Sequence, residues 1–479
     1  MVKREGVLAP GGAVGLRARD SDLEGPMTRR HTEFVLVLGM LMACAPLAID
    51  MYLPSIPTLE RELSAGAGQA QFTLAAYFIG MAIGQAFYGP LADRFGRKPP
   101  LYAGMILFVL GSVACALAPT IESLVVARFV QALGGSAGMV IALAMVRDLF
   151  DPKTSARVFS QVVLVMGVAP VLAPLVGGYV LAAAGWRAIF WALAGFGLVC
   201  LASVALRLLE TRPVGSGGPA GIGAALQTYF RLARDPRFVG YAFSGGLAAA
   251  GMFAYISGSP HVLIDLYGVP PQAYGWIFSA NALGLIVASQ FNRWLLARFT
   301  PDAVLARAFM MVAFSGVALV LLAKTNAAGL AGILVPLFFY VASLGFVNPN
   351  ASAGALADQA ERAGSASALL RTLQFGMATV AGALVGALHN ASALPMAGVI
   401  AACGVDALVM HRRLIAVPRL ATSGGGNDEI RAVRGNGAID HRIAQEALTR
   451  GHAIIGVGRD PARSETRNHV PIDGRQRQH

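Results

Sequence analysis

Twelve apolar runs of membrane-spanning length, separated by short polar loops, constrain the fold of this sequence more than any other feature. A helix needs about 20 mostly apolar residues to cross the hydrocarbon core of a bilayer. Backbone polar groups find no water there, so runs of this kind must be helical. The runs lie at residues 34–57, 70–91, 100–118, 121–147, 157–182, 186–208, 237–259, 272–295, 304–323, 328–353, 366–388 and 392–411. The sequence therefore predicts an all-α integral membrane protein.

Composition supports this class and excludes others. Hydrophobic residues make up 56% of the 479 residues and charged residues 13%, unlike the balance of a soluble domain. The net charge of +12 does not indicate nucleic-acid binding, because the basic residues lie in short loops and tails. The cysteines all lie within apolar runs, where they favour core packing over disulfides or a metal site: Cys44, Cys115, Cys200 and Cys403. We expect no metal and no cofactor.

The runs fall into two sets of six around a polar stretch, which indicates an internal repeat of two six-helix halves. The predicted divisions are a cytoplasmic N-terminal tail at 1–33, a first half at 34–210, a central cytoplasmic loop at 211–236, a second half at 237–411 and a polar tail at 412–479.

Basic residues are concentrated in alternate loops, and Lys and Arg prefer the cytoplasmic side of a membrane. Loops and span ends predicted to lie inside carry Arg94, Arg97, Lys98, Arg147, Lys153, Arg157, Arg207, Arg212, Arg231, Arg234, Arg237, Arg293, Arg298, Arg307 and Arg362. Those predicted to lie outside carry only Arg61, Arg187 and Lys324. This asymmetry predicts twelve spans with both termini in the cytoplasm.

The loop between the second and third runs reads Gly89-Pro-Leu-Ala-Asp-Arg-Phe-Gly-Arg-Lys98. Its spacing resembles the loop 2–3 motif of the major facilitator superfamily of transporters, in which acidic and basic residues form a latch that closes the cytoplasmic side. The alternative is an ordinary positively charged loop. The resemblance implies a cytoplasmic gate in which Asp93 and Arg97 form the latch pair, Arg94 adds charge, and the glycines allow close approach and a tight turn: Gly89, Asp93, Arg94, Gly96 and Arg97.

Asp50 lies inside the first apolar run and Arg128 inside the fourth. Charges within a membrane span are costly and mark functional sites. An aspartate can neutralise itself by binding a proton, although Asp50 can also be read as an interfacial residue that ends its span. Arg128 and the following Gln131 resemble the fourth-span motif that the superfamily uses in proton transfer. Because both charges lie at compatible depth, we expect Asp50 and Arg128 to pair and to couple protons.

The fifth run contains Gly167-Val-Ala-Pro-Val-Leu-Ala-Pro-Leu-Val-Gly-Gly178. It resembles the antiporter motif of drug-exporting transporters, although Ala173 stands where that motif has glycine. A kinked packing helix rich in small residues is the alternative, and both interpretations can hold together. The motif residues are Gly167, Pro170, Pro174, Gly177 and Gly178.

The stretch Ile49-Asp-Met-Tyr-Leu-Pro-Ser-Ile-Pro57 is similar to the Bcr/CflA family of drug-resistance transporters, and the likeness covers residues 34–411. The resemblance implies a proton-coupled exporter of chloramphenicol-like or bicyclomycin-like drugs in the bacterial inner membrane, and not an enzyme. A proton/nutrient symporter of the same superfamily and a non-transporting sensor are the alternatives. Arg371 departs from the family pattern, which has a small residue there; it either snorkels to the cytoplasmic face or helps to select substrate.

The remaining polar lining is thin, which suits amphipathic drugs better than sugars. The residues that we expect to line the substrate path are Tyr52, Tyr77, Gln131, Asn281 and Gln374.

The polar tail contains a stretch, residues 434–461, that resembles the opening of an extended short-chain dehydrogenase. Its glycine-rich turn is incomplete, because Arg434 and Asp440 replace the outer two glycines and only Gly437 remains. One helix and one strand cannot bury a core. We expect a disordered remnant rather than a working transporter–dehydrogenase fusion.

Overall fold

The structure is a computed structural model in which residues 29–66, 68–150, 152–211, 222–359, 362–415, 429–430 and 453–454 are described. Its first unit ends at Val417 and its second contains Pro418–His479. Within the second unit the described residues are β1 (Glu429–Ile430) and β2 (Ala453–Ile454), which pair in parallel. The rest of the predicted dinucleotide-fold fragment, and the disorder expected for it, lie outside the described residues.

The first six-helix half contains α1 (Arg29–Asp50), α3 (Gln71–Phe95), α4 (Lys98–Leu117), α5 (Ile121–Leu149), α6 (Pro152–Ala184) and α7 (Trp186–Arg207). Two short helices, η2 (Leu53–Ser55) and α2 (Ile56–Glu62), follow α1. The second half contains α9 (Pro236–Pro260), α10 (Pro271–Leu295), α11 (Pro301–Thr325), α12 (Gly329–Leu356), α13 (Ala363–Ala387) and α14 (Leu394–Leu414), with the π-helix η3 (His261–Leu266) after α9.

Each predicted apolar run corresponds to one long helix, so the twelve-helix fold is confirmed. Among the described helices, eleven are long and apolar enough to cross a membrane by length and composition. The long helix that falls outside this set is α10, which carries polar residues such as Gln272, Asn281 and Asn292. Several helix ends differ from the predicted run ends. Helix α1 already begins at Arg29 and ends at Asp50, and the central loop contains a further helix, α8 (Ile222–Leu232).

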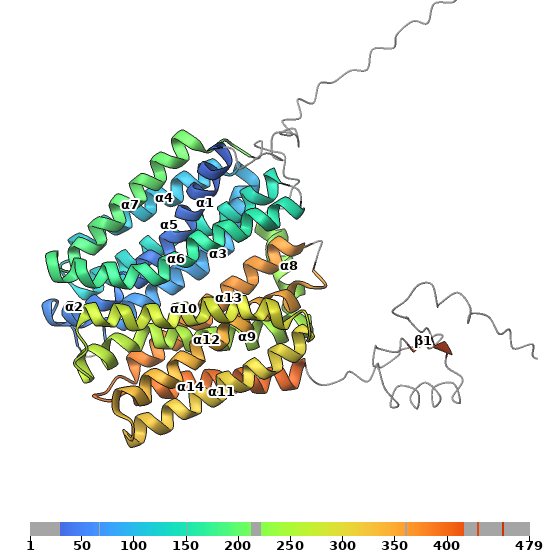
Figure 1. Ribbon diagram of the computed structural model, residues 1–479. Coiled ribbons are helices and arrows are strands. Elements are labelled where there is room, and N and C mark those ends of the chain that lie inside the picture. Colours follow the sequence, from blue (N-terminus) through green and yellow to red (C-terminus); the bar gives the residue numbers. More distant parts are fainter. Residues whose placement is uncertain are drawn as a thin grey trace, which may run out of the picture. The chain divides into compact units, whose positions relative to one another are not determined.

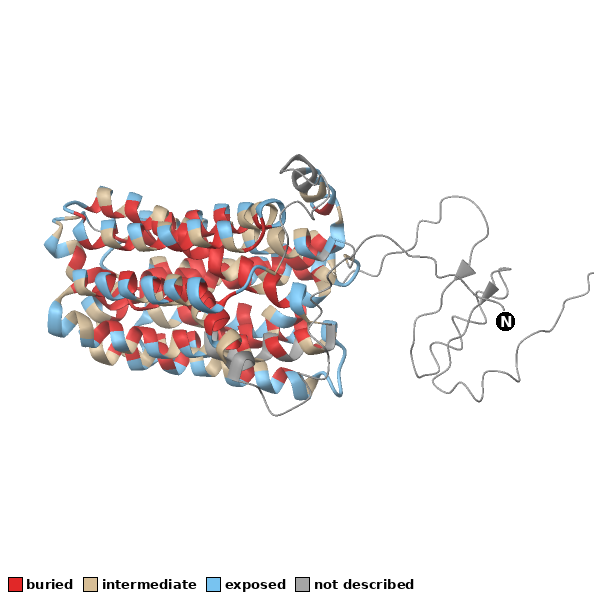
Figure 2. Ribbon diagram, turned by 90° about the horizontal axis from the view of Figure 1, so that it is seen from above, coloured by how far each residue is buried: buried red, intermediate tan, exposed pale blue. Residues whose placement is uncertain are grey.

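The two halves lie side by side, and Figure 1 shows α1 and α3–α7 on one side of α9–α14. They meet where α3 packs against α13 and where α6 packs against α10. Burial follows this arrangement, because buried residues lie between the helices and exposed ones on the outer faces (Figure 2). Exposed positions include large apolar residues such as Leu110, Leu117 and Phe314. An apolar outer surface of this kind is what a bilayer solvates.

Several helix ends are set by local sequence. Thr120 caps α5 in a reciprocal capping box with Ser123, and Asp235 caps α9 by accepting from the backbone of Arg237 and Phe238. Gly96 ends α3 with a φ of +85°, in the left-handed region that favours glycine. We call the end of the bundle that contains the α3–α4 loop the Asp93 end, and the opposite end, where α13 meets α14, the His389 end.

Candidate functional site

The Asp93 end contains a hydrogen-bonded charge network centred on Arg97, whose side chain is almost fully buried. The guanidinium donates from NH1 to Asp93 at 2.8 Å and, in a bidentate manner, to Asp148 at 2.6 and 3.1 Å. Burial lowers the pKa of Arg97, but the hydrogen bonds and charges of Asp148, together with those of Asp93, outweigh it and raise the pKa above its ordinary value. Arg97 is therefore a permanent cation.

The network extends to Glu210, which follows α7. Its carboxylate accepts from the backbone N–H groups of Arg97 and Lys98 at 2.8 and 2.9 Å, while the Lys98 ammonium donates to the Leu208 carbonyl at 2.8 Å. The gate predicted from the sequence did not include Asp148 or Glu210. The available signal was weak: each is an acidic residue at the end of an apolar run that the charge pattern places inside. The hydrogen-bond partners of Arg97 all belong to the first half, so the network joins α3, α4, α5 and the end of α7.

Two other residues of the predicted gate have different surroundings. Arg94 is exposed and lies over the Phe95 ring at 5.2 Å. A Cβ at Gly89 would meet no described atom within 4 Å, so the close helix approach expected at that glycine is not made.

Arg128 lies fully buried in the first half and does not pair with Asp50, although both residues are described. Its NH1 group donates to the Ala48 carbonyl at 2.9 Å and to Gln131 Oε1 at 2.6 Å. The guanidinium also stacks over the rings of Tyr77 at 4.2 Å and Tyr52 at 4.8 Å. The predicted ion pair is therefore wrong: a backbone carbonyl, an amide and two aromatic faces take the place of a carboxylate.

Asp50 ends α1 and is 5% exposed. The chain then turns through η2, where Pro54 stops the first helix from continuing. The helix η2, which begins three residues after Asp50, packs against α9 and α10 of the second half. Asp50 thus lies where the two halves meet.

Three of the motif residues of α6, Pro174, Gly177 and Gly178, lie at helix contacts. A Cβ at Gly177 would collide with the Met51 carbonyl of the first half, and one at Gly178 would lie 2.8 Å from the Pro271 carbonyl of the second. Across the same contact, a Cβ at Gly275 would lie 2.9 Å from the Pro174 carbonyl. We call this contact of α6 with α10 the α6–α10 seam. Gly167 lies away from it, and a Cβ there would meet no described atom within 4 Å.

The five predicted lining residues fall into two groups. Tyr52, Tyr77 and Gln131 are fully buried in the first half, where they contact Arg128, and Gln131 also donates to Ser112 at 2.8 Å. In this conformation their positions lie inside a helix bundle rather than on an open path. Asn281 donates to the Tyr255 hydroxyl at 2.9 Å, and the partly exposed Gln374 accepts from Arg371 at 3.2 Å. The substrate contact of all five stays a prediction.

An aromatic cluster joins the halves near the centre of the bundle. The Phe78 ring of α3 lies 4.7 Å from that of Phe253 in α9, and the Phe375 ring of α13 lies 5.7 Å from that of Phe253. The sequence prediction of the substrate path did not include Phe253 or Phe375. Their position depends on the rotation of each helix about its axis, which the length of an apolar run does not reveal.

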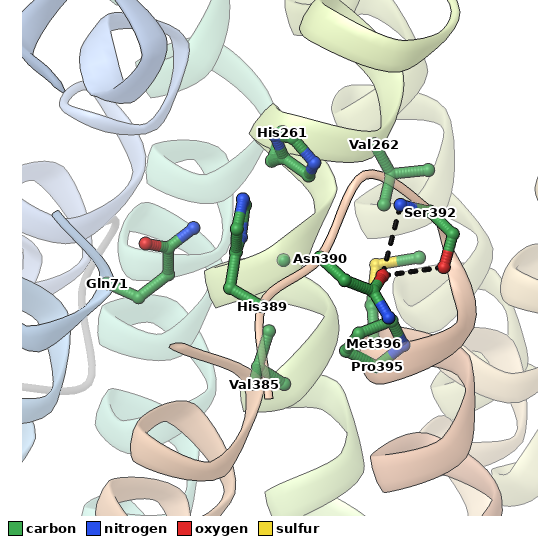
Figure 3. A pocket seen from close by; sticks show the side chains of 10 residues that line it. Gln71, His261, Val262, Val385, His389, Asn390, Ser392, Pro395 and Met396 are labelled. Atoms are coloured by element: carbon green, nitrogen blue, oxygen red, sulfur yellow. Dashed lines mark hydrogen bonds between the residues drawn. The ribbon is translucent and has the colours of Figure 1, made fainter. Parts of the chain in front are cut away.

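At the His389 end a small pocket lies between the halves (Figure 3). His389 lies between Gln71 of the first half and His261 of the second, and the two imidazole rings are 4.1 Å apart. His261 Nδ1 lies 3.3 Å from Asp265, which forms an ion pair at 3.5 Å with Arg61 of the first half. Burial, and then the neighbouring His261, lower the pKa of His389.

Residues 38–383 match the sequence model of the Major Facilitator Superfamily, and this range is well over half of the chain. The chain belongs to the Major Facilitator Superfamily. It is therefore a multi-pass membrane transporter with a small-molecule substrate, since members of this family move solutes across membranes. The predicted resemblance to the drug-resistance branch is confirmed by relatives of the chain.

Two of these relatives carry drug-resistance names. The chain is 31% identical over 378 residues to a bicyclomycin resistance protein homolog of Haemophilus influenzae, which covers 79% of the chain and 95% of the relative. It is 29% identical over 400 residues to the multidrug resistance protein MdtL of Klebsiella pneumoniae, covering 81% and 97%. A solved D-xylose–proton symporter shares the fold, with a TM-score of 0.63, 16% identity and coverage of 81% of the chain and 98% of that structure.

Proposed function

We propose that this transporter is a proton-coupled antiporter that exports small amphipathic drugs of the chloramphenicol or bicyclomycin type. One observation carries the proposal: Asp50 is a buried carboxylate at the junction of the two halves, and no cation pairs with it among the described residues. A carboxylate in such a place is costly while charged, and binding a proton removes that cost. The names of the two drug-resistance relatives support a drug substrate of the bicyclomycin type, and the chloramphenicol type rests on the resemblance of residues 49–57 to the Bcr/CflA family.

Proton and drug transport would be coupled through competition between the proton and the drug for the Asp50 carboxylate. A proton that reaches Asp50 from one side neutralises it and changes how favourably the halves pack there, because the following segment, η2, packs against α9 and α10 of the second half. Release on the other side restores the charge. A cationic drug competes directly with the proton, whereas a neutral drug is coupled through the change between the two conformations.

The proposed orientation of the protein in the membrane rests on the distribution of basic residues, which assigns the Asp93 end to the cytoplasm. The α6–α10 seam and the pocket at His389 then belong to the outer side, where the two halves are packed together. In this arrangement drug enters from the cytoplasm and leaves after the outer contacts separate. The Arg97 network would act as the cytoplasmic latch when Asp93 approaches the second half.

The direction of transport rests on α6. Two of its motif residues, Pro174 and Gly178, lie in the seam with α10, and the resemblance of that motif to drug antiporters favours export over nutrient uptake. A proton/nutrient symporter would share the fold and the Arg97 network, so only a transport measurement separates the two functions.

The test is uphill drug transport and drug susceptibility in an efflux-deficient host, with and without the gene. Asp50→Asn is expected to abolish proton-driven export while the protein still inserts. Asp358→Asn is the matched control, since Asp358 is exposed and pairs with Arg237 at 2.7 Å away from the junction. Uphill export with normal pH dependence by the Asp50→Asn variant would place the proton site elsewhere, and unchanged susceptibility with the wild-type gene would refute drug export.

A further inference from the structure

Arg371 is a charge in the middle of a membrane-spanning helix that neither the latch nor the proton site uses. It lies eight positions after Ala363 in the 25-residue helix α13. At 1.5 Å per residue this is about 12 Å from the start of the helix, and about 6 Å from its midpoint. A position about 6 Å from the helix midpoint lies within a hydrocarbon core about 30 Å thick, where a charged side chain is costly.

The contacts of its neighbour Phe375 show where the face of α13 that carries Arg371 lies. Residues four apart lie on one face of a helix, so Arg371 shares its face with Phe375, whose ring contacts Phe78 of the first half and Phe253 of the second. The Arg371 side chain is exposed, although it lies on the face of α13 that Phe375 directs toward both halves. An exposed charge on a face of this kind is in position to meet a solute that enters between the halves.

The charge of Arg371 is not neutralised by a neighbouring carboxylate. Its NH1 donates to Gln374 Oε1 at 3.2 Å, an uncharged acceptor one turn further along the helix. Within the described part of the chain no acidic residue forms an ion pair with it. A guanidinium presents five donors in a planar fork, of which most remain available for a ligand.

We propose that Arg371 selects substrate: it favours compounds with a carboxylate or another electron-rich oxygen group and disfavours lipophilic cations. The inference rests on the proposed export function and names the substrate class of the same path. The guanidinium would bind the oxygen group, while the rings of Phe78, Phe253 and Phe375 contact the apolar part of the drug. Charge repulsion in a cavity walled by protein is stronger than in bulk water, so a permanent cation is disfavoured there.

The experiment compares export of three probes by the full-length protein: fusidate, a carboxylate; chloramphenicol, a neutral nitro compound; and ethidium, a permanent cation. Arg371→Gln is expected to lower the ratio of fusidate to ethidium export about tenfold, which corresponds to about 1.4 kcal/mol. Arg371→Glu should reverse the preference, and Arg371→Lys should retain much of it. Arg362→Gln is the matched control, because Arg362 is an exposed arginine just before the same helix.

Two further measurements keep the inference testable if a variant exports poorly. Equilibrium binding of fusidate and ethidium to purified protein requires no turnover and should show the same change of ratio. A cysteine in place of Arg371 should react with an anionic, membrane-impermeant thiol reagent, and fusidate should protect it. Cys403, the least buried of the four native cysteines, is replaced first.

Ratios that change no more in Arg371→Gln than in Arg362→Gln would overturn the inference, as would a cysteine at this position that fusidate does not protect. These outcomes differ from failure of the proposed function. If the wild-type protein binds the probes selectively but moves none of them uphill, drug export fails while the selectivity of Arg371 stands.

Discussion

Replacing Asp148 should cost more stability than replacing Asp93, although Asp93 belongs to the recognised motif and Asp148 does not. Arg97 is buried, so its lost partners are not replaced freely by water. Asp148 accepts two hydrogen bonds from Arg97 at 2.6 and 3.1 Å, and its side chain is 21% exposed. Asp93 accepts one at 2.8 Å, and its side chain is 53% exposed.

The magnitudes follow from these contacts. A hydrogen bond to a charged group contributes about 1.5–3 kcal/mol, and an amide retains part of it. Asp148→Asn loses a charge that balances a buried cation, so we expect a loss of about 2–3 kcal/mol in the free energy of unfolding. An exposed ion pair contributes about 0–1 kcal/mol, so Asp93→Asn should cost less than about 1 kcal/mol.

The assay is denaturant unfolding of both variants in mixed micelles, together with drug export in vesicles. The latch proposal predicts that Asp93→Asn loses turnover while it retains nearly normal stability, whereas Asp148→Asn loses stability as well. Equal destabilisation by both substitutions would refute the reasoning from burial and bond number. Normal export by well-expressed Asp93→Asn protein would refute the latch.

Two further predictions concern the His389 end and the tail. Burial beside His261 lowers the pKa of His389 in the packed state, so its protonation favours separation of the halves. As the pH falls below about 6.5, a cysteine placed at Gln71 should therefore be labelled faster by a thiosulfonate reagent, relative to one at the exposed Lys324. His389→Gln should remove this acid response, and an unchanged response would refute the role of His389. The charged groups that face the histidine pair from α2 and η3 are Glu60, Arg61 and Asp265. Truncation after Leu420 should leave export unchanged, and a clear loss of export from a stably expressed truncation would show that the tail has a function.

The helices were predictable because length and apolarity determine a membrane span almost alone. The contacts between them were less predictable, since run length says nothing about rotation around a helix axis. Asp50 and Arg128 lie at similar depth, yet the arginine turns to the Ala48 carbonyl, 80 positions away along the chain. Arg97 likewise meets Asp148 across 51 positions and Glu210 across 113.

Local chemistry explains the remaining differences. The prediction continued the first run to residue 57, whereas Pro54 lies in a separate short helix after Asp50. The prediction treated α10 like the other spans, but α10 is more polar. Its polar side chains form hydrogen bonds inside the protein: Asn281 donates to Tyr255, and Asn292 accepts from Asn350. Such uses are invisible until the partner helices are known.

The α6–α10 seam restricts how this transporter can change under selection by new drugs. Its contacts run from backbone to backbone at Gly178 and Gly275, so no change of rotamer can make room for a larger residue. In the proposed function, side chains on the substrate path, such as Arg371, carry no such restriction. Variation that changes the range of substrates is therefore expected along that path, whereas positions 178 and 275 are expected to stay glycine.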